Sequence, residues 1–332
     1  MKHLLISSLE PGLAVESVYL VRDVVKKTRK SGEPFASLIL QDSSGTVNAV
    51  MWDEAEAFLA RGVRSGDFVL IRGDVGQYNR QIQLTIREAK KVDPSLIQVE
   101  KFLPVSPRPI MEMKKELFQW IERVKIPHLR ALLDIFFGDD AFLAGFLRAP
   151  SARTMHQAYI GGLVEHTLGV VKNAVTIADN YNDVDKELLI TGALLHDGSK
   201  VYEYSFQTSI NYTDKGRLIG HLSMMAMEIE NRARAIPGFP EETIMLLEHM
   251  ILAHHGRREF GSPKVPMTAE AMILFYADYI DAYLSMYFEQ KKKAIEKGEQ
   301  WTDWVDMFGS FLYAGSPQDD SEDNRTKETV DP

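Results

Sequence analysis

Histidine and aspartate residues recur in the second half of the chain in an order that suits a metal centre. His196 and Asp197 stand together at the end of a strongly apolar run, residues 188–195. Further candidate ligands lie before and after this pair: His166, His221, His254, His255 and Asp278. Imidazole suits ions such as zinc, iron and nickel, whereas carboxylate suits manganese and magnesium, so the mixed set predicts a transition-metal site. Two ions could share the set if Asp197 bridged them.

Helices are expected to position these side chains. The hydrophobic periodicity predicts helices over 161–181, 186–196, 221–235, 242–255 and 268–297. Neighbouring residues on a regular helix point about 100° apart, so His196 and Asp197 can reach one site only where a helix ends, and Gly198 provides that end. Asp278 lies in an apolar stretch, where an unpaired carboxylate would be costly, so a metal or another cation is its expected partner.

The bulk composition fits a soluble enzyme of two domains. The 332 residues exceed the roughly 250–300 at which single hydrophobic cores stop growing. No apolar run reaches the ~18 residues of a membrane span, and the first residues lack the long apolar stretch and cleavage site of a signal peptide. Because the chain has no cysteine, disulfides, thiolate catalysis and cysteine-ligated zinc are excluded. We therefore expect a cytoplasmic protein without a membrane partner.

The first third of the chain reads as β structure. Strands are expected over 15–28, 35–41, 46–52, 68–75 and 81–88, with a short helix over 53–60. Five strands with a helix between the third and fourth match the order of the OB-fold, a small five-stranded β-barrel. The expected fold is therefore multidomain, a five-stranded OB-fold barrel followed by an all-α domain.

Changes in composition set the expected boundaries. The barrel takes residues 10–92, a proline-rich linker takes 93–110, and the helical domain takes 111–312. The last residues, 313–332, are acidic and almost free of large apolar side chains, so we expect a disordered tail.

The predicted barrel carries residue types that bind single-stranded nucleic acid. Aromatic rings stack on bases while lysine and arginine follow the phosphates. The candidates are Tyr19, Arg22, Lys26, Phe35, Trp52, Tyr78 and Arg80. Each ring could instead belong to the barrel core, and OB-folds also bind oligosaccharides and proteins, so the fold alone does not decide. The net charge of −9 does not exclude nucleic acid, because one face of an acidic protein can still be basic.

The segments around the candidate ligands resemble the HD superfamily of metal-dependent phosphohydrolases. The matching segments are HQAYIGGLVEHTLGVV (156–171), GALLHDGSK (192–200), GRLIGHLSM (216–224), AHHGRREFGSPKVPMTAEA (253–271) and YADYIDAY (276–283). Together with the expected OB-fold, residues 10–310 resemble the YhaM-type 3′→5′ exoribonucleases, which join such a barrel to an HD domain.

The resemblance implies residue roles by matched position. The superfamily's core metal ligands match His166, His196, Asp197 and Asp278, and the histidines that hold a second ion match His221, His254 and His255. Lys200 matches a lysine expected near phosphate oxygens, although Gly198-Ser199-Lys200 stands where the family commonly shows Ile-Gly-Lys. Asp281 is expected to orient a ligand, and His156 to support the site or contact substrate, with a purely structural role as the alternative.

The implied activity is hydrolysis of single-stranded RNA from its 3′ end to nucleoside 5′-monophosphates, with single-stranded DNA as a second substrate class. Asp197 and Lys200 are the catalytic candidates. The cofactor would be one or two divalent ions, manganese first, with cobalt, iron, nickel or magnesium as alternatives. Three other interpretations stay open: an HD phosphohydrolase of nucleotides regulated by the barrel, a binding protein with a structural metal site, and a diiron oxygenase. The sequence does not predict an oligomeric state.

Overall fold

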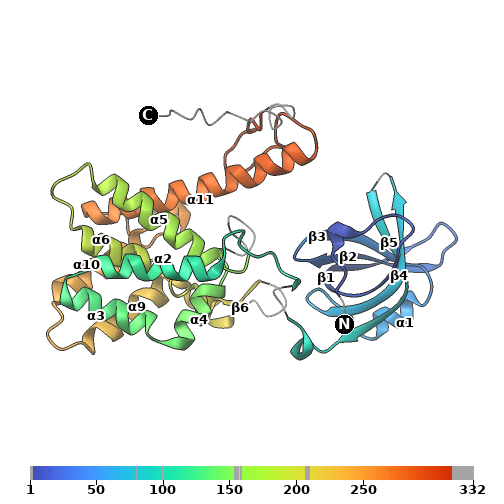
Figure 1. Cartoon of the computed structure of the whole chain (residues 1–332), viewed down its shortest axis with the longest axis horizontal. Helices are drawn as coiled ribbons and strands as arrows, with labels where there is room; N and C mark the ends of the chain where they lie inside the picture. The colour runs from blue at the N-terminus through green and yellow to red at the C-terminus, as the bar shows by residue number, and fades with distance from the viewer. Residues whose placement is uncertain are drawn as a thin grey trace, which may run out of the picture.

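The computed structural model describes residues 3–79, 81–98, 101–152, 157, 159–205 and 210–315. Figure 1 shows two bodies, a β-barrel made by the first third of the chain and a group of helices, joined by the segment that follows β5. The predicted fold class, an OB-fold barrel followed by a helical domain, is confirmed. Within the described part of the chain, no helix is both long enough and apolar enough to cross a membrane.

The barrel closes from five strands in the order β1-β2-β3-β5-β4. The strands are β1 (Ala14–Thr28), β2 (Pro34–Asp42), β3 (Gly45–Met51), β4 (Phe68–Tyr78) and β5 (Gln81–Val92). The short helix α1 (Ala55–Ala60) lies between β3 and β4, as predicted. Strands β3 and β5 run parallel, and the other neighbours are antiparallel. Alternate residues point inward and form an apolar core that includes Leu38, Leu40, Ile71 and Leu84.

The proline-rich segment after β5 packs on the outside of the barrel. Phe102 and Leu103 are buried in a small apolar cluster with Val18 and Phe68 of the barrel and with Ile160. The side chain of Gln41 donates a hydrogen bond to the carbonyl of Phe102 (3.1 Å). Ile160 also forms a parallel bridge with Val105. This segment is therefore folded against both bodies, which its four prolines alone did not predict.

Helices form the second body. They are α2 (Ile110–Arg123), α3 (Pro127–Phe137), α4 (Asp140–Arg148), α5 (Gly162–Ala178), α6 (Lys186–Leu195), α7 (Lys200–Glu203), α8 (Asp214–Ile219), α9 (His221–Arg234), α10 (Glu241–Ala253) and α11 (Ala269–Glu296). Every residue of α6 from Leu188 to Leu195 is buried, so this helix runs through the core. A two-stranded sheet, β6 (Tyr204–Ser205) with β7 (Asn211–Tyr212), interrupts the helices and is a small departure from the predicted all-α domain.

The chain folds back on itself after α11. Bridges join Trp301 to Tyr313 and Val305 to Ser310, and the hydroxyl of Tyr287 donates to the carbonyl of Tyr313 (2.8 Å). The predicted start of the disordered tail at residue 313 is therefore too early, because paired aromatic residues extend the folded part. Residues 316–332 of that predicted tail lie outside the described residues.

Candidate metal centre

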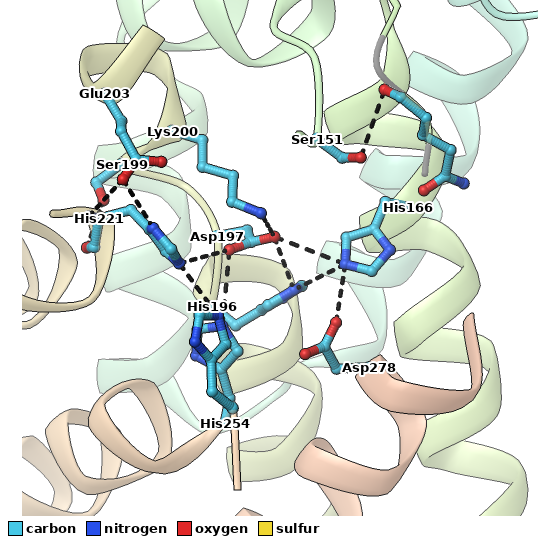
Figure 2. A network of polar contacts seen from close by, with 12 residues as sticks. Ser151, His166, His196, Asp197, Ser199, Lys200, Glu203, His221, His254 and Asp278 are labelled. Atoms are coloured by element: carbon cyan, nitrogen blue, oxygen red, sulfur yellow. Dashed lines mark hydrogen bonds and ion pairs between the residues drawn. The ribbon is translucent and has the colours of Figure 1, made fainter. Parts of the chain in front are cut away.

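The seven predicted metal ligands converge on one place in the helical body. His166 comes from the first turns of α5, His196 and Asp197 follow α6, and His221 begins α9. His254 and His255 follow α10, and Asp278 comes from α11. Figure 2 shows Asp197 in the middle, with His166 and Asp278 on one side and His221 on the other.

The first group of ligand atoms gathers around one oxygen of Asp197. The Nε2 atom of His166 lies 3.6 Å from Asp197 Oδ2, 3.4 Å from His196 Nε2 and 3.0 Å from Asp278 Oδ1. His196 Nε2 is itself 3.4 Å from Asp197 Oδ2. Two imidazoles and two carboxylates thus present four ligand atoms to one small volume.

The second group gathers around the other oxygen of the same carboxylate. Asp197 Oδ1 lies 3.5 Å from His221 Nε2 and 3.6 Å from His254 Nε2. The Nε2 atoms of His221 and His255 are 3.4 Å apart. Asp197 therefore offers one oxygen to each group, the arrangement that a bridging ligand between two ions requires.

The residues fit a pair of divalent ions. Donors bound at about 2.0–2.2 Å from one ion lie roughly 3.0–3.6 Å from one another, which is the spacing found here. Asp197 Oδ1 and His254 Nε2 are buried without a hydrogen-bond partner among the described residues. Their 3.6 Å separation is too long for a hydrogen bond between them. A cation would offset the cost of these two unsatisfied buried atoms.

Each of the five histidines is held through its other ring nitrogen. Two of the Nδ1 atoms face carboxylates: that of His166 lies 2.7 Å from Asp281 Oδ2, and that of His221 lies 3.0 Å from Glu203 Oε1. The other three face backbone carbonyl oxygens: His196 that of Ala193 (2.7 Å), His254 that of Ile251 (2.8 Å) and His255 that of Phe260 (3.1 Å). An Nδ1–H that donates to such an acceptor leaves Nε2 free to bind a metal and fixes the ring orientation.

Two of these supports are carboxylates, and the sequence pointed to only one of them. Asp281 lies where a residue that orients a ligand was expected. Glu203 was not predicted, although it is buried and accepts hydrogen bonds from both the ring and the backbone N–H of His221. Its only sequence signal is its place three residues after Lys200, because the pairing with His221 depends on how α7 and α9 pack.

Burial and charge shift several pKa values in the centre. Burial alone would lower the pKa of His166, but hydrogen bonds with Asp278 and Asp281 outweigh it and raise that pKa to about 10. Burial would raise the pKa of Asp197, but the charge of Lys200 and the nearby His196 hold it well below its usual range. Burial, with His254 and His221 close by, lowers the pKa of His255 to about 3.

In the barrel, the structure brings some of the predicted nucleic-acid contacts together. The rings of Phe35 and Trp52 lie 4.7 Å apart, and the guanidinium of Arg29 stands 5.0 Å from the Trp52 ring centre. Trp52 and Tyr78 are exposed, and so are Arg22 and Lys26.

One predicted contact in the barrel is wrong. The Tyr19 side chain is fully buried, and its hydroxyl donates to the carbonyl of Leu4 (2.9 Å), so it belongs to the barrel core. Two other predicted site residues, Arg80 and His156, lie outside the described residues.

Comparisons with known proteins match both bodies. A family model for the HD domain matches residues 163–283, and a model for an OB-fold nucleic acid binding domain matches residues 19–92. The chain is 33% identical over 291 residues to the 3′-5′ exoribonuclease YhaM of Bacillus subtilis, covering 87% of this chain and 91% of that protein. It is 36% identical over 283 residues to the YhaM of Listeria innocua, covering 83% and 88%. The chain belongs to the YhaM family.

In this YhaM-family chain, Lys200 lies directly against the shared carboxylate. Its ammonium donates to Asp197 Oδ2 (2.6 Å) although its side chain is only 9% exposed. Figure 2 shows the lysine reaching down from α7 to the carboxylate that both ligand groups share. The Gly198-Ser199 variation before it therefore leaves the ammonium beside the centre.

Proposed function

We propose that this chain is a metal-dependent 3′-5′ exoribonuclease that hydrolyses single-stranded RNA to nucleoside 5′-monophosphates and also accepts single-stranded DNA. The supporting observation is the single carboxylate, Asp197, shared between two groups of histidine and aspartate ligand atoms. Membership in a family of proteins named as 3′-5′ exoribonucleases supports the substrate and direction of cleavage. A cytoplasmic location belongs to the same proposal.

The proposed centre holds two divalent ions. His166, His196, Asp278 and Asp197 Oδ2 would hold one, and His221, His254, His255 and Asp197 Oδ1 the other. Manganese suits this histidine and carboxylate set, with cobalt, iron, nickel and magnesium as alternatives. When bound, such ions generate a nucleophile from water at neutral pH and offset charge on the phosphate oxygens.

The protein's own residues orient these groups and the substrate. Asp281 and Glu203 hold the rings of His166 and His221, so the ligand atoms are placed before substrate arrives. The ammonium of Lys200, fixed beside Asp197, adds positive charge where charge develops on the non-bridging oxygens of the scissile phosphate. In the barrel, Phe35, Trp52 and Tyr78 would stack on upstream bases while Arg22 and Lys26 follow the phosphates.

The test is cleavage of a 5′-labelled single-stranded RNA by the metal-stripped protein with and without added Mn²⁺. We expect a ladder that shortens from the 3′ end only when the ion is present. Asp197→Asn should remove this activity, by about 1000-fold or more, while RNA binding persists, since the amide nitrogen cannot bind an ion and only one uncharged oxygen remains for the two groups of ligands. The matched control is Asp183→Asn, an exposed residue away from the centre. Full turnover by Asp197→Asn would refute the site, and an intact strand with every ion would refute the activity.

A further inference from the structure

Two stacked aromatic rings belong to residues that adjoin candidate metal ligands through the backbone. Phe260 and Tyr279 have ring centres 6.3 Å apart and planes inclined by 17°. Each is tied to a candidate ligand: the carbonyl of Phe260 lies 3.1 Å from the Nδ1 atom of His255, and Tyr279 directly follows Asp278 on α11. Both residues are therefore anchored through the backbone next to a candidate ligand, on two separate segments of the chain.

The stack continues away from the centre along α11. One turn after Tyr279, the ring of Tyr283 stacks on it at 4.0 Å and 26°. Phe308, from the segment that folds back after α11, meets Tyr283 edge-on at 5.0 Å. Phe260 at the near end is 45% exposed, and Tyr279 and Tyr283 are half-buried. The row of rings therefore runs from an exposed end at Phe260 to the segment that follows α11.

The backbone around Phe260 is held in place by close packing. Gly256 has φ +74 and lies directly against the ring of Phe275, where a Cβ atom would overlap that ring. The hydroxyl of Ser262 lies within hydrogen-bond distance of two carbonyl oxygens, those of Leu252 (3.0 Å) and Lys264 (2.6 Å), and its hydrogen can be donated to either, which holds the loop closed. Phe260 is therefore presented to solvent by an ordered turn, which lowers the entropy cost of stacking a ligand on it.

A positively charged side chain stands beside the Phe260 ring. The guanidinium of Arg257 stands 5.6 Å from the ring centre of Phe260. Arg257 and Arg258 are both exposed, and neither forms an ion pair with any described residue. Aromatic rings beside unpaired arginine are the combination with which proteins hold single-stranded nucleic acid without reading its sequence.

We propose that Phe260 and Tyr279 form a base-stacking platform for the 3′-terminal nucleotides of the strand, with Arg257 against the adjacent phosphate. This inference rests on the proposed exoribonuclease function and adds a second nucleic-acid contact, independent of the barrel. Stacking is insensitive to which base is present, so the platform suits an enzyme that removes successive nucleotides of any kind. Stacking does require a base, however, so removal of a base from the RNA tests whether the platform is used.

The experiment crosses a protein substitution with removal of a base. Wild-type, Tyr279→Leu and Phe260→Leu proteins are compared on RNA that carries a single abasic site at the last, second-last or third-last nucleotide. On intact RNA we expect each substitution to raise KM roughly 5- to 100-fold. At one of the three positions the abasic site should reduce the kcat/KM of the wild type by about as much as the substitutions do on intact RNA. The kcat/KM of both variants should not change when this base is removed. Phe311→Leu, which removes an exposed ring elsewhere, should behave as wild type. Tyr279→Phe, which keeps the ring, should retain the dependence on the abasic site that Tyr279→Leu loses.

A binding measurement separates failure of the platform from failure of the proposed function. RNA with 2-aminopurine at the affected position should lose fluorescence on binding metal-free wild-type protein, because stacking quenches this base, and keep it with Tyr279→Leu. If wild-type protein quenches the probe but does not shorten RNA, the activity fails and the platform stands. The platform is refuted if the variants depend on the abasic site as the wild type does and quench the probe as the wild type does. If these variants also have a lower melting temperature, the rings only pack the C-terminal segment.

Discussion

Asp197 is the residue through which the two halves of the candidate centre are coupled. Its two oxygens face different groups of histidines at 3.4–3.6 Å. The Lys200 ammonium also binds Oδ2, the oxygen that faces His166 and His196. A carboxylate with this many positive or metal-binding neighbours stays ionised, as its depressed pKa indicates. Any account of the chemistry must therefore treat the two groups of ligands as one unit.

The state of His166 predicts that metal binding depends on pH. Its pKa of about 10 means that the ring carries a proton at neutral pH when no ion is bound. In the metal-free protein this charge stabilises the fold at neutral pH, and the contribution is lost as pH rises through about 10. A metal must displace this proton, so affinity should rise with pH up to that value. Calorimetry of metal binding at pH 7, repeated in buffers of different ionisation heat, measures how many protons the protein releases. We expect the His166 ring to contribute close to one proton.

Removing one support of the imidazolium provides the control for this prediction. Asp281→Asn takes away a carboxylate that raises the pKa of His166, so fewer protons should be released at pH 7 and the pH dependence should flatten. Equal proton release by both proteins would show that Asp281 does not hold a charged His166. No release from the wild type would contradict the prediction itself.

At the scale of elements, the contact between α5 and α11 sets the position of His166. Gly169 lies one turn after His166 on α5, and a Cβ atom at this position would overlap Asp281 Oδ1 of α11. The absence of a side chain at 169 therefore lets the two helices approach closely enough for Asp281 to reach the His166 ring. Sequence periodicity predicted both helices but could not show this contact.

Gly169→Ala should therefore weaken both the fold and the centre. The added methyl group must push Asp281 away, which we expect to cost about 1–3 kcal/mol of unfolding free energy and to reduce activity further through a misplaced His166. The matched control is Gly145→Ala on α4, where a Cβ atom would meet Val201 at 3.4 Å, an ordinary contact. That change should fall within about 1 kcal/mol of wild type, since alanine favours a helix. Chemical denaturation curves measure both, and equal stability of the two variants would contradict this account.

The features that the sequence predicted well are those with a local signal. The alternation of residues in the first third gave five strands and one helix in the right order, and the histidine and aspartate spacing gave seven residues that meet in space. The errors concern contacts between distant segments. Tyr19 is an exception, because it alternates with Val15 and Val21 on the inward face of β1, so the pattern itself placed its ring in the barrel core. Glu203 and the stacked pair of Phe260 and Tyr279 depend on how α7, α9 and α11 pack, which no short pattern records.

At the scale of the whole molecule, the barrel and the helical body share an interface through the segment between them. Phe102 and Leu103 pack on Val18 and Phe68 of the barrel, and Ile160 completes the cluster. Deleting the barrel would expose these apolar side chains to water and disturb the segment that leads into α5. A point substitution on the exposed face of the barrel therefore tests its contribution to RNA binding more cleanly than truncation does.

The separation of the two bodies predicts that the effect of a barrel substitution depends on substrate length. Trp52 is exposed, packs against Phe35 at a tilted angle and has the Arg29 guanidinium 5.0 Å from its ring centre, so Trp52→Ala removes a ring that can hold an upstream base. Loss of one stacking contact should weaken binding of a long single strand by about 1–3 kcal/mol. A dinucleotide held at the metal centre should be hydrolysed at the wild-type rate, because a strand must extend beyond the helices to contact the barrel.

KM measured over RNA lengths from two to about thirty nucleotides gives the decisive comparison. The two curves should coincide for the shortest substrates and diverge once the strand reaches the barrel, and the length at which they diverge reports the path between the two bodies. Trp301→Ala, which removes an exposed tryptophan from the segment after α11, should follow the wild type at every length. A uniform loss at all lengths would mean that Trp52 supports the fold of the enzyme and does not hold its substrate.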